Sequence, residues 1–442
     1  MQILSQGFDI SVKKVSLRRL KPKLNRNIGR DMRTDKILFF QAALFALLFA
    51  SCGQKDTGQL MGVEDRPNWS GFNPYGMVYV PSGELHIGHS DEDMFNTYNA
   101  RPKAISISGF FMDDTEITNN EYREFVYWVR DSIAHVYMGD VYTDDYGNEK
   151  IDWEYELDYS DEMLADMYLS GDQTLYGSKQ LNTSLLNYEF REVDLKKAAN
   201  TPNATIDEIL RKEVVNIYPD TLCWVRDFTY SYNEPLTRNY FSHPAFDDYP
   251  VVGIKWKQAK AFSYWRTKLW NSSNSDEPNT EEFRLPTEWE WEYAARGGKD
   301  VAPFPWGAYY LRNAKGCLLA NFKPGRGHYA EDGGQTTVDV YAYYPNDYGL
   351  YNMSGNVAEW TITSYKDNAN YHVHDLNPDF KYEAKDDDHK ALKRKVVRGG
   401  SWKDIGYYLQ NGTRNWEYQD TSKSYIGFRN VITFLGRSMN DF

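Results

Sequence analysis

The sequence predicts an α+β protein with a loop-rich fold and one long insertion. Hydrophobic residues make up 41% of its 442 residues and charged residues 26%, a balance typical of a folded globular chain. Short runs that alternate apolar and polar residues, as β-strands do, occur between segments whose apolar residues have helical spacing. Aromatic residues reach 16%, which suits an irregular core filled by large rings, although such rings also line sugar-binding and peptide-binding faces.

The folded part begins with two predicted strands and a helix. Residues 77–80 and 104–107 alternate in polarity and are closed by turn residues, which predicts strands. Apolar side chains recur at helical spacing in residues 120–133, which predicts an amphipathic helix. Thr118, followed three residues later by Glu121, has the pattern of a capping box, so we expect the helix to begin there.

Residues 134–242 follow no clean pattern, and we interpret them as a long insertion in the domain. Asp, Glu and Tyr crowd this stretch, and one helix is expected near residues 206–214. A segment of this length inside a compact fold is usually functional or disordered. Its apolar pieces at residues 214–218 and 228–230 favour an ordered interaction surface.

Regular patterning resumes after residue 243. A helix is expected at residues 257–269. Thr287 with Glu290 forms a second capping box, which predicts a helix that runs to Gly297 and Gly298.

The N-terminus is predicted to be a lipoprotein signal peptide. Arg33 and Lys36 precede an apolar run at residues 37–50 that is too short to span a bilayer well, and small residues flank Cys52. These features match a bacterial lipobox, in which Cys52 is lipidated and becomes the mature N-terminus, and they make Met32 an alternative start to Met1. The predicted parts are an N-terminal extension with the signal peptide at 1–52, a linker at 53–73, the folded domain at 74–435 and a tail at 436–442.

Charge is distributed unevenly along the chain. Residues 1–36 hold ten Lys or Arg and three Asp or Glu, whereas the remainder holds 40 basic and 60 acidic residues. An acidic body argues against nucleic-acid binding and favours basic partners or cations. Besides Cys52 the chain has only Cys223 and Cys317, which either form one disulfide in an oxidising compartment or stay free.

Six motifs in a fixed order resemble the formylglycine-generating, or sulfatase-modifying, enzyme family. The motifs lie at residues 77–83, 116–119, 250–256, 284–298, 349–360 and 398–429. The resemblance implies a large, irregular α+β domain that is related to C-type lectins.

The same resemblance implies that the chemistry of the family has been lost. Family enzymes bind Cu(I) through two cysteine thiolates, a soft-ligand site, and use it with oxygen to oxidise a substrate cysteine. Those two positions correspond to Asp404 and Leu409 here, and a structural cysteine of the family's first long helix corresponds to Ser263. A carboxylate and an alkyl group cannot replace two thiolates, so we expect no copper and no catalytic residues.

Calcium is a separate expectation from the resemblance. Family members bind calcium through oxygen ligands, which tolerate mixed carboxylate, amide and carbonyl donors. One family site maps onto Asn352, Gly355, Val357 and Glu359, and another maps onto Asn321, Phe322, Asp332 and Gly334. The alternative is that Asn352 and Glu359 only hydrogen-bond to buried loop backbone.

A closer resemblance covers nearly the whole mature chain, including the predicted insertion. The lipobox and residues 127–133, 216–221 and 227–233 are similar to the GldK/PorK lipoproteins of the type IX secretion and gliding machinery of Bacteroidetes. That resemblance implies a non-catalytic lipoprotein that is anchored to the outer membrane, with a periplasmic body, and that forms a ring with copies of itself and a GldN/PorN-like partner. Two other functions remain open: a formylglycine-generating oxidase with an unrecognised site, and a lectin-like lipoprotein that binds glycan or peptide.

Overall fold

The computed structural model describes the folded domain with a few short gaps. The described residues are 74–88, 102–144, 147, 149–171, 174, 179–229, 234–274, 280–331 and 333–436. The predicted signal peptide with Cys52, the linker, Asp332 and all but the first residue of the predicted tail lie outside them. None of the helices in the described part of the chain is long and apolar enough to cross a membrane.

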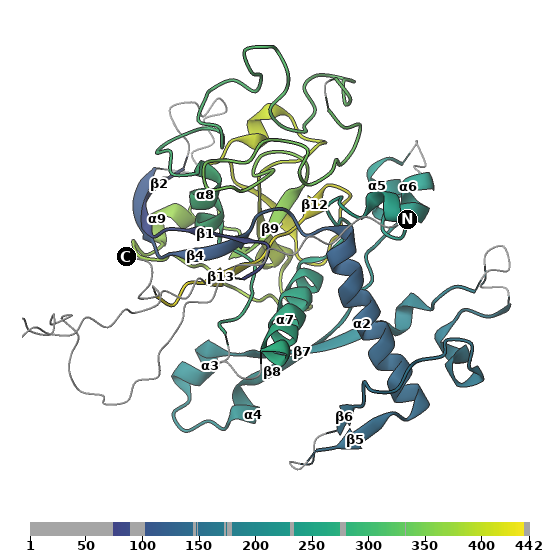
Figure 1. The fold of residues 1–442 in the computed structure, drawn as a ribbon. Coiled ribbons are helices and arrows are strands. Elements are labelled where there is room, and N and C mark those ends of the chain that lie inside the picture. The colour runs from purple at the N-terminus through teal and green to yellow at the C-terminus, as the bar shows by residue number, and fades with distance from the viewer. Residues whose placement is uncertain are drawn as a thin grey trace, which may run out of the picture. The chain divides into compact units, whose positions relative to one another are not determined.

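Two small sheets and three hairpins provide the β-structure (Figure 1). In the four-stranded sheet the order is β11-β10-β9-β12, with β12 parallel to β9 and the other pairs antiparallel. The three-stranded antiparallel sheet, β1-β4-β13, joins the start of the domain to its end. The strands are β1 Met77–Val80, β2 Gly83–Ile87, β3 Lys103–Ile107, β4 Phe110–Asp113, β5 Val141–Thr143, β6 Glu149–Ile151, β7 Asn187–Val193, β8 Leu210–Asn216, β9 Ala358–Ser364, β10 Arg394–Arg398, β11 Asn415–Tyr418, β12 Ile426–Gly427 and β13 Val431–Thr433.

Three helices are long enough to organise the core. They are α2 Asn119–Met138, α7 Trp256–Ser273 and α8 Glu288–Arg296. The shorter α-helices are α3 Leu195–Asn200, α4 Ile206–Ile209, α5 Cys223–Asp227, α6 Glu234–Asn239 and α9 Ala369–His372. Short 3-10 turns lie at η1 Glu162–Met167, η3 Thr183–Leu185, η4 Pro244–Phe246, η5 Lys390–Lys393 and η6 Gly406–Leu409.

Both predicted capping boxes are confirmed. The Thr118 hydroxyl accepts a hydrogen bond from the Glu121 backbone N–H, and the Glu121 carboxylate accepts one from the Thr118 N–H at 2.8 Å. The helix that they open, α2, runs past the predicted end because apolar burial continues through Ala134, and it stops at Gly139 with φ 81°. Helix α8 has the same box at its start and ends at Gly297 with φ 58°.

Large aromatic side chains fill the main core, as the composition suggested. This core lies between α2, α7 and the four-stranded sheet, where Tyr122 of α2 stacks on Phe262 of α7 with ring centroids 5.6 Å apart. Trp360 of β9 is fully buried there, and its indole N–H donates to a backbone carbonyl. Burying the ring while satisfying its one polar group is the arrangement that makes a core tryptophan stabilising.

The prediction of a helix near residues 206–214 is wrong. Only Ile206–Ile209 is helical, and Leu210–Asn216 forms strand β8, which pairs with β7 along all seven residues. The apolar residues at 206, 209 and 210 imitate helical spacing, but β-branched residues follow at 214 and 215 and favour a strand once a partner strand is present.

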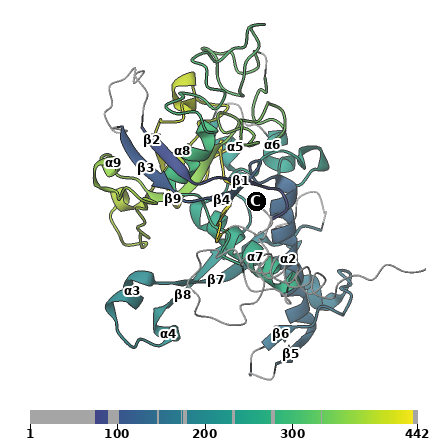
Figure 2. The same cartoon turned by 60° about the vertical axis from the view of Figure 1, so that its left-hand side comes forward.

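The hairpins of the segment predicted as an insertion lie on the side of α2 and α7 that faces away from α8, whereas its α5 and α6 helices lie near the start of α2. Figures 1 and 2 both show the β5-β6 and β7-β8 hairpins and the α3 and α4 helices on that side. The β7-β8 hairpin packs on α7 through Tyr188 and Phe190, whose rings contact Tyr264. The segment is therefore ordered where it is described. Its hairpins add a surface to the domain, whereas Cys223, Trp224 and Tyr240 pack in a core with Trp402.

Candidate functional site

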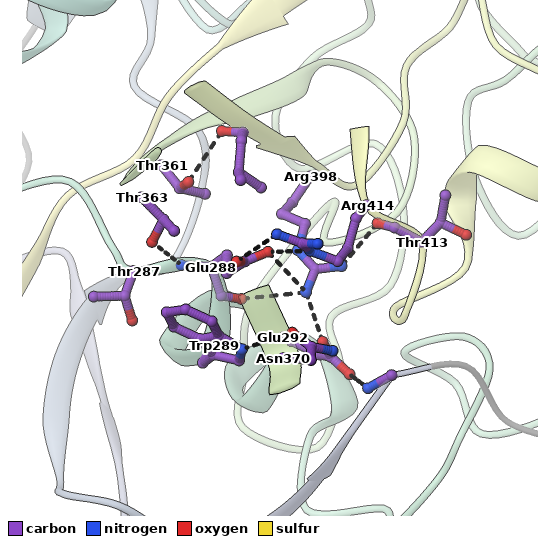
Figure 3. Close-up of polar contacts among 12 residues, drawn as sticks. Thr287, Glu288, Trp289, Glu292, Thr361, Thr363, Asn370, Arg398, Thr413 and Arg414 are labelled. Carbon is purple, nitrogen blue, oxygen red and sulfur yellow. Dashed lines mark hydrogen bonds and ion pairs between the residues drawn. The ribbon is translucent and has the colours of Figure 1, made fainter. Parts of the chain in front are cut away.

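The signature motifs come together in a buried ionic network (Figure 3). Glu288 and Glu292, one turn apart on α8, face Arg398 at the end of β10 and Arg414 just before β11. The Arg414 Nε lies 2.7 Å from Glu288 Oε2, and the Arg398 Nη2 lies 2.6 Å from Glu292 Oε2. All four side chains are excluded from solvent, so these charges are available to no ligand.

Further hydrogen bonds complete this network. Glu292 also accepts from Arg296 at 2.6 Å and from the Gly88 backbone N–H at 3.0 Å. The second nitrogen of Arg398 donates to the Thr413 carbonyl at 2.7 Å. Burial favours the neutral acid, but the guanidinium groups of Arg296 and Arg398 outweigh it and hold the pKa of Glu292 below its usual range. This dry network of ion pairs holds α8 against the sheet, and guanidinium groups engage both of its carboxylates.

The two positions that hold thiolates in the related enzymes are occupied by groups of other chemistry. Asp404 accepts a hydrogen bond from the Ser401 hydroxyl at 2.6 Å, and burial raises the pKa of its carboxyl. Leu409 is 0% exposed and belongs to a small core with Phe304 and Phe322. Leu409 of this segment is therefore part of the packing.

The remaining cysteines do not restore a thiol pair. Cys223 and Cys317 are both free, the first buried and the second exposed, so the disulfide alternative is not formed in this structure. Burial among apolar side chains raises the pKa of the Cys223 thiol well above its usual value. Neither thiol lies in the segment of residues 401–409.

A hollow of about 710 Å³ lies beside this segment. Its lining includes Phe228, Tyr329 and Trp402. Trp402 is only 1% exposed, and its ring stacks on Phe228 with centroids 5.5 Å apart. The indole face of Trp402 is thus engaged within the protein and does not offer the exposed platform on which a lectin-like site would stack a sugar.

The residues of the first predicted calcium site lie together, but their polar atoms are largely engaged. Arg429 donates to Glu359 Oε1 at 2.7 Å and to Oε2 at 2.8 Å, and the Trp291 indole also donates to Oε2. The Asn352 amide nitrogen donates to Glu116 and to the Val340 carbonyl. Gly355 and Val357 follow on the same buried loop. A calcium ion at this set would therefore compete with the guanidinium of Arg429 for Glu359.

The second predicted calcium site is assembled in part. A Cβ added at Gly334 would lie 3.4 Å from the side-chain nitrogen of Asn321, so these two positions are neighbours. The Asn321 amide donates to the Thr336 carbonyl at 2.8 Å, and the Phe322 ring packs in the core with Leu409. Asp332 lies outside the described residues. No group of three or more His, Cys, Asp or Glu side chains in the described part of the chain could hold a metal, so calcium here would depend on amide and carbonyl oxygens and remains a prediction.

Sequence reasoning missed the burial of Glu116. This carboxylate is fully buried and accepts hydrogen bonds from the side-chain amides of Asn352, at 3.0 Å, and Asn356, at 3.1 Å. Burial, with the nearby Glu359 charge, raises its pKa to about 8. Its signal in the sequence is its place in the family motif at residues 116–119, two residues before the helix cap Thr118.

Sequence reasoning also missed the ion pairs between lysines of α7 and glutamates of the β7-β8 hairpin, which attach the hairpin to the domain. Lys260 of α7 lies 2.5 Å from Glu192 of β7, and Lys257 lies 2.8 Å from Glu213 of β8. Lys395 of β10 is buried with its ammonium 3.8 Å from the centroid of the Trp256 ring. Burial, together with the neighbouring Lys260, lowers the pKa of Lys395 to about 7.

These observations define an irregular α+β domain whose signature residues are structural and whose thiol pair is missing. A family model described as the sulfatase-modifying factor enzyme 1-like domain matches residues 67–434, and the chain belongs to that family.

Relatives of both catalytic and non-catalytic description are similar to the chain. It is 32% identical over 209 residues to the inactive C-alpha-formylglycine-generating enzyme 2 of Bos taurus, covering 44% of this chain and 56% of that protein. It is 35% identical over 189 residues to the formylglycine-generating enzyme of Mus musculus, covering 41% of this chain and 44% of that protein. The chain thus spans about half the length of these two relatives. Among solved structures, PvdO from Pseudomonas aeruginosa superposes with a TM-score of 0.45 at 17% identity, covering 81% of this chain and 94% of that one.

Proposed function

We propose that this chain is a non-catalytic member of its family that serves as a structural subunit of a secretion machine. In this proposal it is an outer-membrane lipoprotein, anchored through Cys52 with its body in the periplasm. It forms a ring of the type IX secretion and gliding machinery with copies of itself and a GldN/PorN-like partner. The observation that carries the non-catalytic part is the pair Asp404 and Leu409 at the two thiolate positions.

The chemistry at those positions supports a scaffold rather than an oxidase. Cu(I) prefers soft thiolate ligands, and neither a carboxylate nor an alkyl group supplies one. Leu409 packs among Phe304, Leu318 and Phe322, so a metal could reach that position only by disrupting a core. The buried ionic network of α8 and β10 keeps the fold intact without any sulfur ligand.

The segment of residues 134–242 supports the binding part of the proposal. It carries apolar side chains that remain exposed in the chain alone, among them Leu195, Ile206 and Val214. Exposed apolar side chains that gather on one region are typical of surfaces that become buried in an assembly. Calcium, if bound at Asn321 and Gly334, would stabilise a loop and have no catalytic duty.

Affinity purification from native membranes tests the proposal directly. The full-length lipidated protein, extracted in mild detergent, should co-purify with a GldN/PorN-like protein, and native mass spectrometry should detect oligomers of both. A Cys52→Ser variant should leave the membrane fraction and still bind the partner. Monomers without any partner would contradict the ring.

An oxidation assay tests the main competing function. A peptide with the sequence Cys-x-Pro-x-Arg, incubated with the protein, Cu(I) and oxygen, should keep its cysteine unmodified. Conversion of that cysteine to formylglycine would overturn the non-catalytic assignment. A glycan array with clear hits would instead favour the lectin-like alternative.

A further inference from the structure

The C-terminal half of α2 forms one wall of an apolar groove. The groove has a volume of about 240 Å³ and lies between α2, the β6 strand and the start of β7. Its lining is mainly apolar, and the lining residues are Trp128, Val129, Ser132, Ile133, Val136, Tyr137, Ile151, Asn187 and Tyr188. The α2 residues among them recur at helical spacing over nine residue steps, which is about 13 Å of helix, or two and a half turns.

Large apolar side chains stay open to solvent at this groove. Val136 is 55% exposed and Tyr137 is 40% exposed, although both line it. Trp153, 48% exposed, stacks on Trp128 with ring centroids 5.6 Å apart and so extends the apolar lining past the rim. Exposed aromatic and branched side chains around a hollow are typical of the centre of a binding surface.

The segment that contributes Ile151 of β6 to the groove is strongly acidic. Residues 140–172 hold twelve Asp or Glu and a single basic residue, Lys150. Asp140 and Asp144 pair locally, with His135 and Lys150. Six further carboxylates are exposed, and none of them forms an ion pair with the residues that the structure describes: Glu149, Glu154, Glu156, Asp158, Glu162 and Asp166.

These features together define the chemistry of the occupant. An apolar trough two and a half turns long, beside a helix, matches the apolar stripe of one amphipathic helix. Exposed, unpaired carboxylates in the chain beside Ile151 and Trp153 attract Lys and Arg on the flanks of that stripe. A second copy of this chain would present the same acidic segment, and like charges would repel across a two-fold contact.

We propose that this groove, formed by α2, β6 and the start of β7, binds a basic amphipathic helix of a partner protein. The inference rests on the proposed function in its assumption that the chain acts by binding. It adds which face binds and what the partner presents: apolar residues at positions i, i+4 and i+8, flanked by Lys or Arg. Figures 1 and 2 place this groove-bearing end of α2 away from α8 and β9, so the occupant would not approach the buried motif network.

A synthetic helix tests the proposal without knowledge of the partner. The probe is a fluorescein-labelled 18-residue peptide of Leu and Lys in amphipathic order, and the protein is the full-length chain with Cys52→Ser, so that no lipid competes for the peptide. Fluorescence anisotropy should detect binding that weakens with salt, because exposed charges are screened over about 10 Å at 0.1 M. Two control peptides, one with Glu in place of Lys and one with the same residues in non-helical order, should bind at least about tenfold more weakly.

Matched variants locate the binding. Glu149→Gln, Glu154→Gln and Glu156→Gln together should weaken the Lys peptide about tenfold at low salt. An equal change of charge elsewhere, at the exposed Asp367, Asp386 and Asp387, each to Asn, should leave the affinity within about twofold.

Val136→Ser should weaken binding about fivefold through lost apolar contact alone. Circular dichroism confirms that each variant is folded.

Equal affinity for all variants, or tighter binding of the Glu peptide, would overturn the proposal. If the peptide does not bind while a GldN/PorN-like protein still co-purifies, this groove is not the interface and the proposed function stands. If the peptide binds as expected but no ring partner is found, the groove stands and the ring assignment fails.

Discussion

Replacing Arg398 by Met should destabilise the protein severely, because the buried ionic network is structural. The guanidinium is 1% exposed, lies 2.6 Å from Glu292 Oε2 and donates to the Thr413 carbonyl at 2.7 Å. Met has a similar length and no donor. Breaking one partner of a buried ion pair costs roughly 3–5 kcal/mol, and an orphaned buried carbonyl adds roughly 1–3 kcal/mol. Glu292 keeps its bond to Arg296, so we expect about 4 kcal/mol in total.

Urea unfolding followed by tryptophan fluorescence measures this cost. The midpoint should fall with an unchanged slope, since the surface exposed on unfolding stays the same. The matched control is Arg312→Met, which removes an ion pair of similar length, 2.7 Å between Arg312 and Glu331. The side chains of these two residues are 42% and 44% exposed. Exposed pairs of this kind contribute under about 1 kcal/mol.

The comparison of these two variants can refute the structural interpretation of the motif. If Arg398→Met unfolds at the same urea concentration as Arg312→Met, the network does not hold α8 to the sheet. The Arg398 motif would then need another role, and a retained catalytic one would be the first to examine. A loss of about 4 kcal/mol would be a large share of the 5–15 kcal/mol by which folded proteins are typically stable.

Three further outcomes follow from buried groups. The pKa of Lys395 is lowered to about 7 in the folded state, so the unfolded chain binds more protons between about pH 7 and the usual lysine value of 10.5. The free energy of unfolding should therefore rise over that window, by roughly 3–5 kcal/mol at most. Lys395→Met should remove this rise, which thermal melts at pH 6 and pH 10 measure. Returning calcium after chelation should raise the melting temperature, and Asn321→Ala should abolish that rise. Glu359→Gln should destabilise the protein equally with and without calcium, because the partner of Glu359 is Arg429. No calcium effect on the unaltered protein would contradict the predicted ion. With Cys52→Ser, a thiol reagent should label Cys317 at once and Cys223 only on unfolding, whereas a disulfide between them would leave no thiol to label in the unfolded protein.

Local patterns were enough to predict the elements whose signals are local. The helix that starts after Thr118 and the helix that starts after Thr287 begin where the capping boxes indicate, because a capping box satisfies backbone donors within four residues. The strand at residues 77–80 was predicted from alternation alone and is β1.

What the sequence concealed depends on contacts between distant residues. Strand β8 was mistaken for a helix because its pairing with β7, across a connection of sixteen residues, has no local sign. The ion pair of Glu359 with Arg429 joins residues seventy positions apart, and no spacing rule relates them. Glu116 lies in the motif at residues 116–119, but the motif does not indicate burial, which depends on the packed loop around Asn352.

Residues 401–409 contribute to the packing of the fold. A working copper site needs two thiolates that solvent, metal and oxygen can reach, and such a reachable site contributes little to packing. Here Leu409 is fully buried, and burying a leucine side chain contributes about 1.5–3 kcal/mol. Asp404 keeps its carboxylate bonded to Ser401, so its partial burial leaves no polar group unpaired. Leu409 therefore adds to the core of the domain, whereas large apolar side chains of α2, among them Val136 and Tyr137, stay exposed.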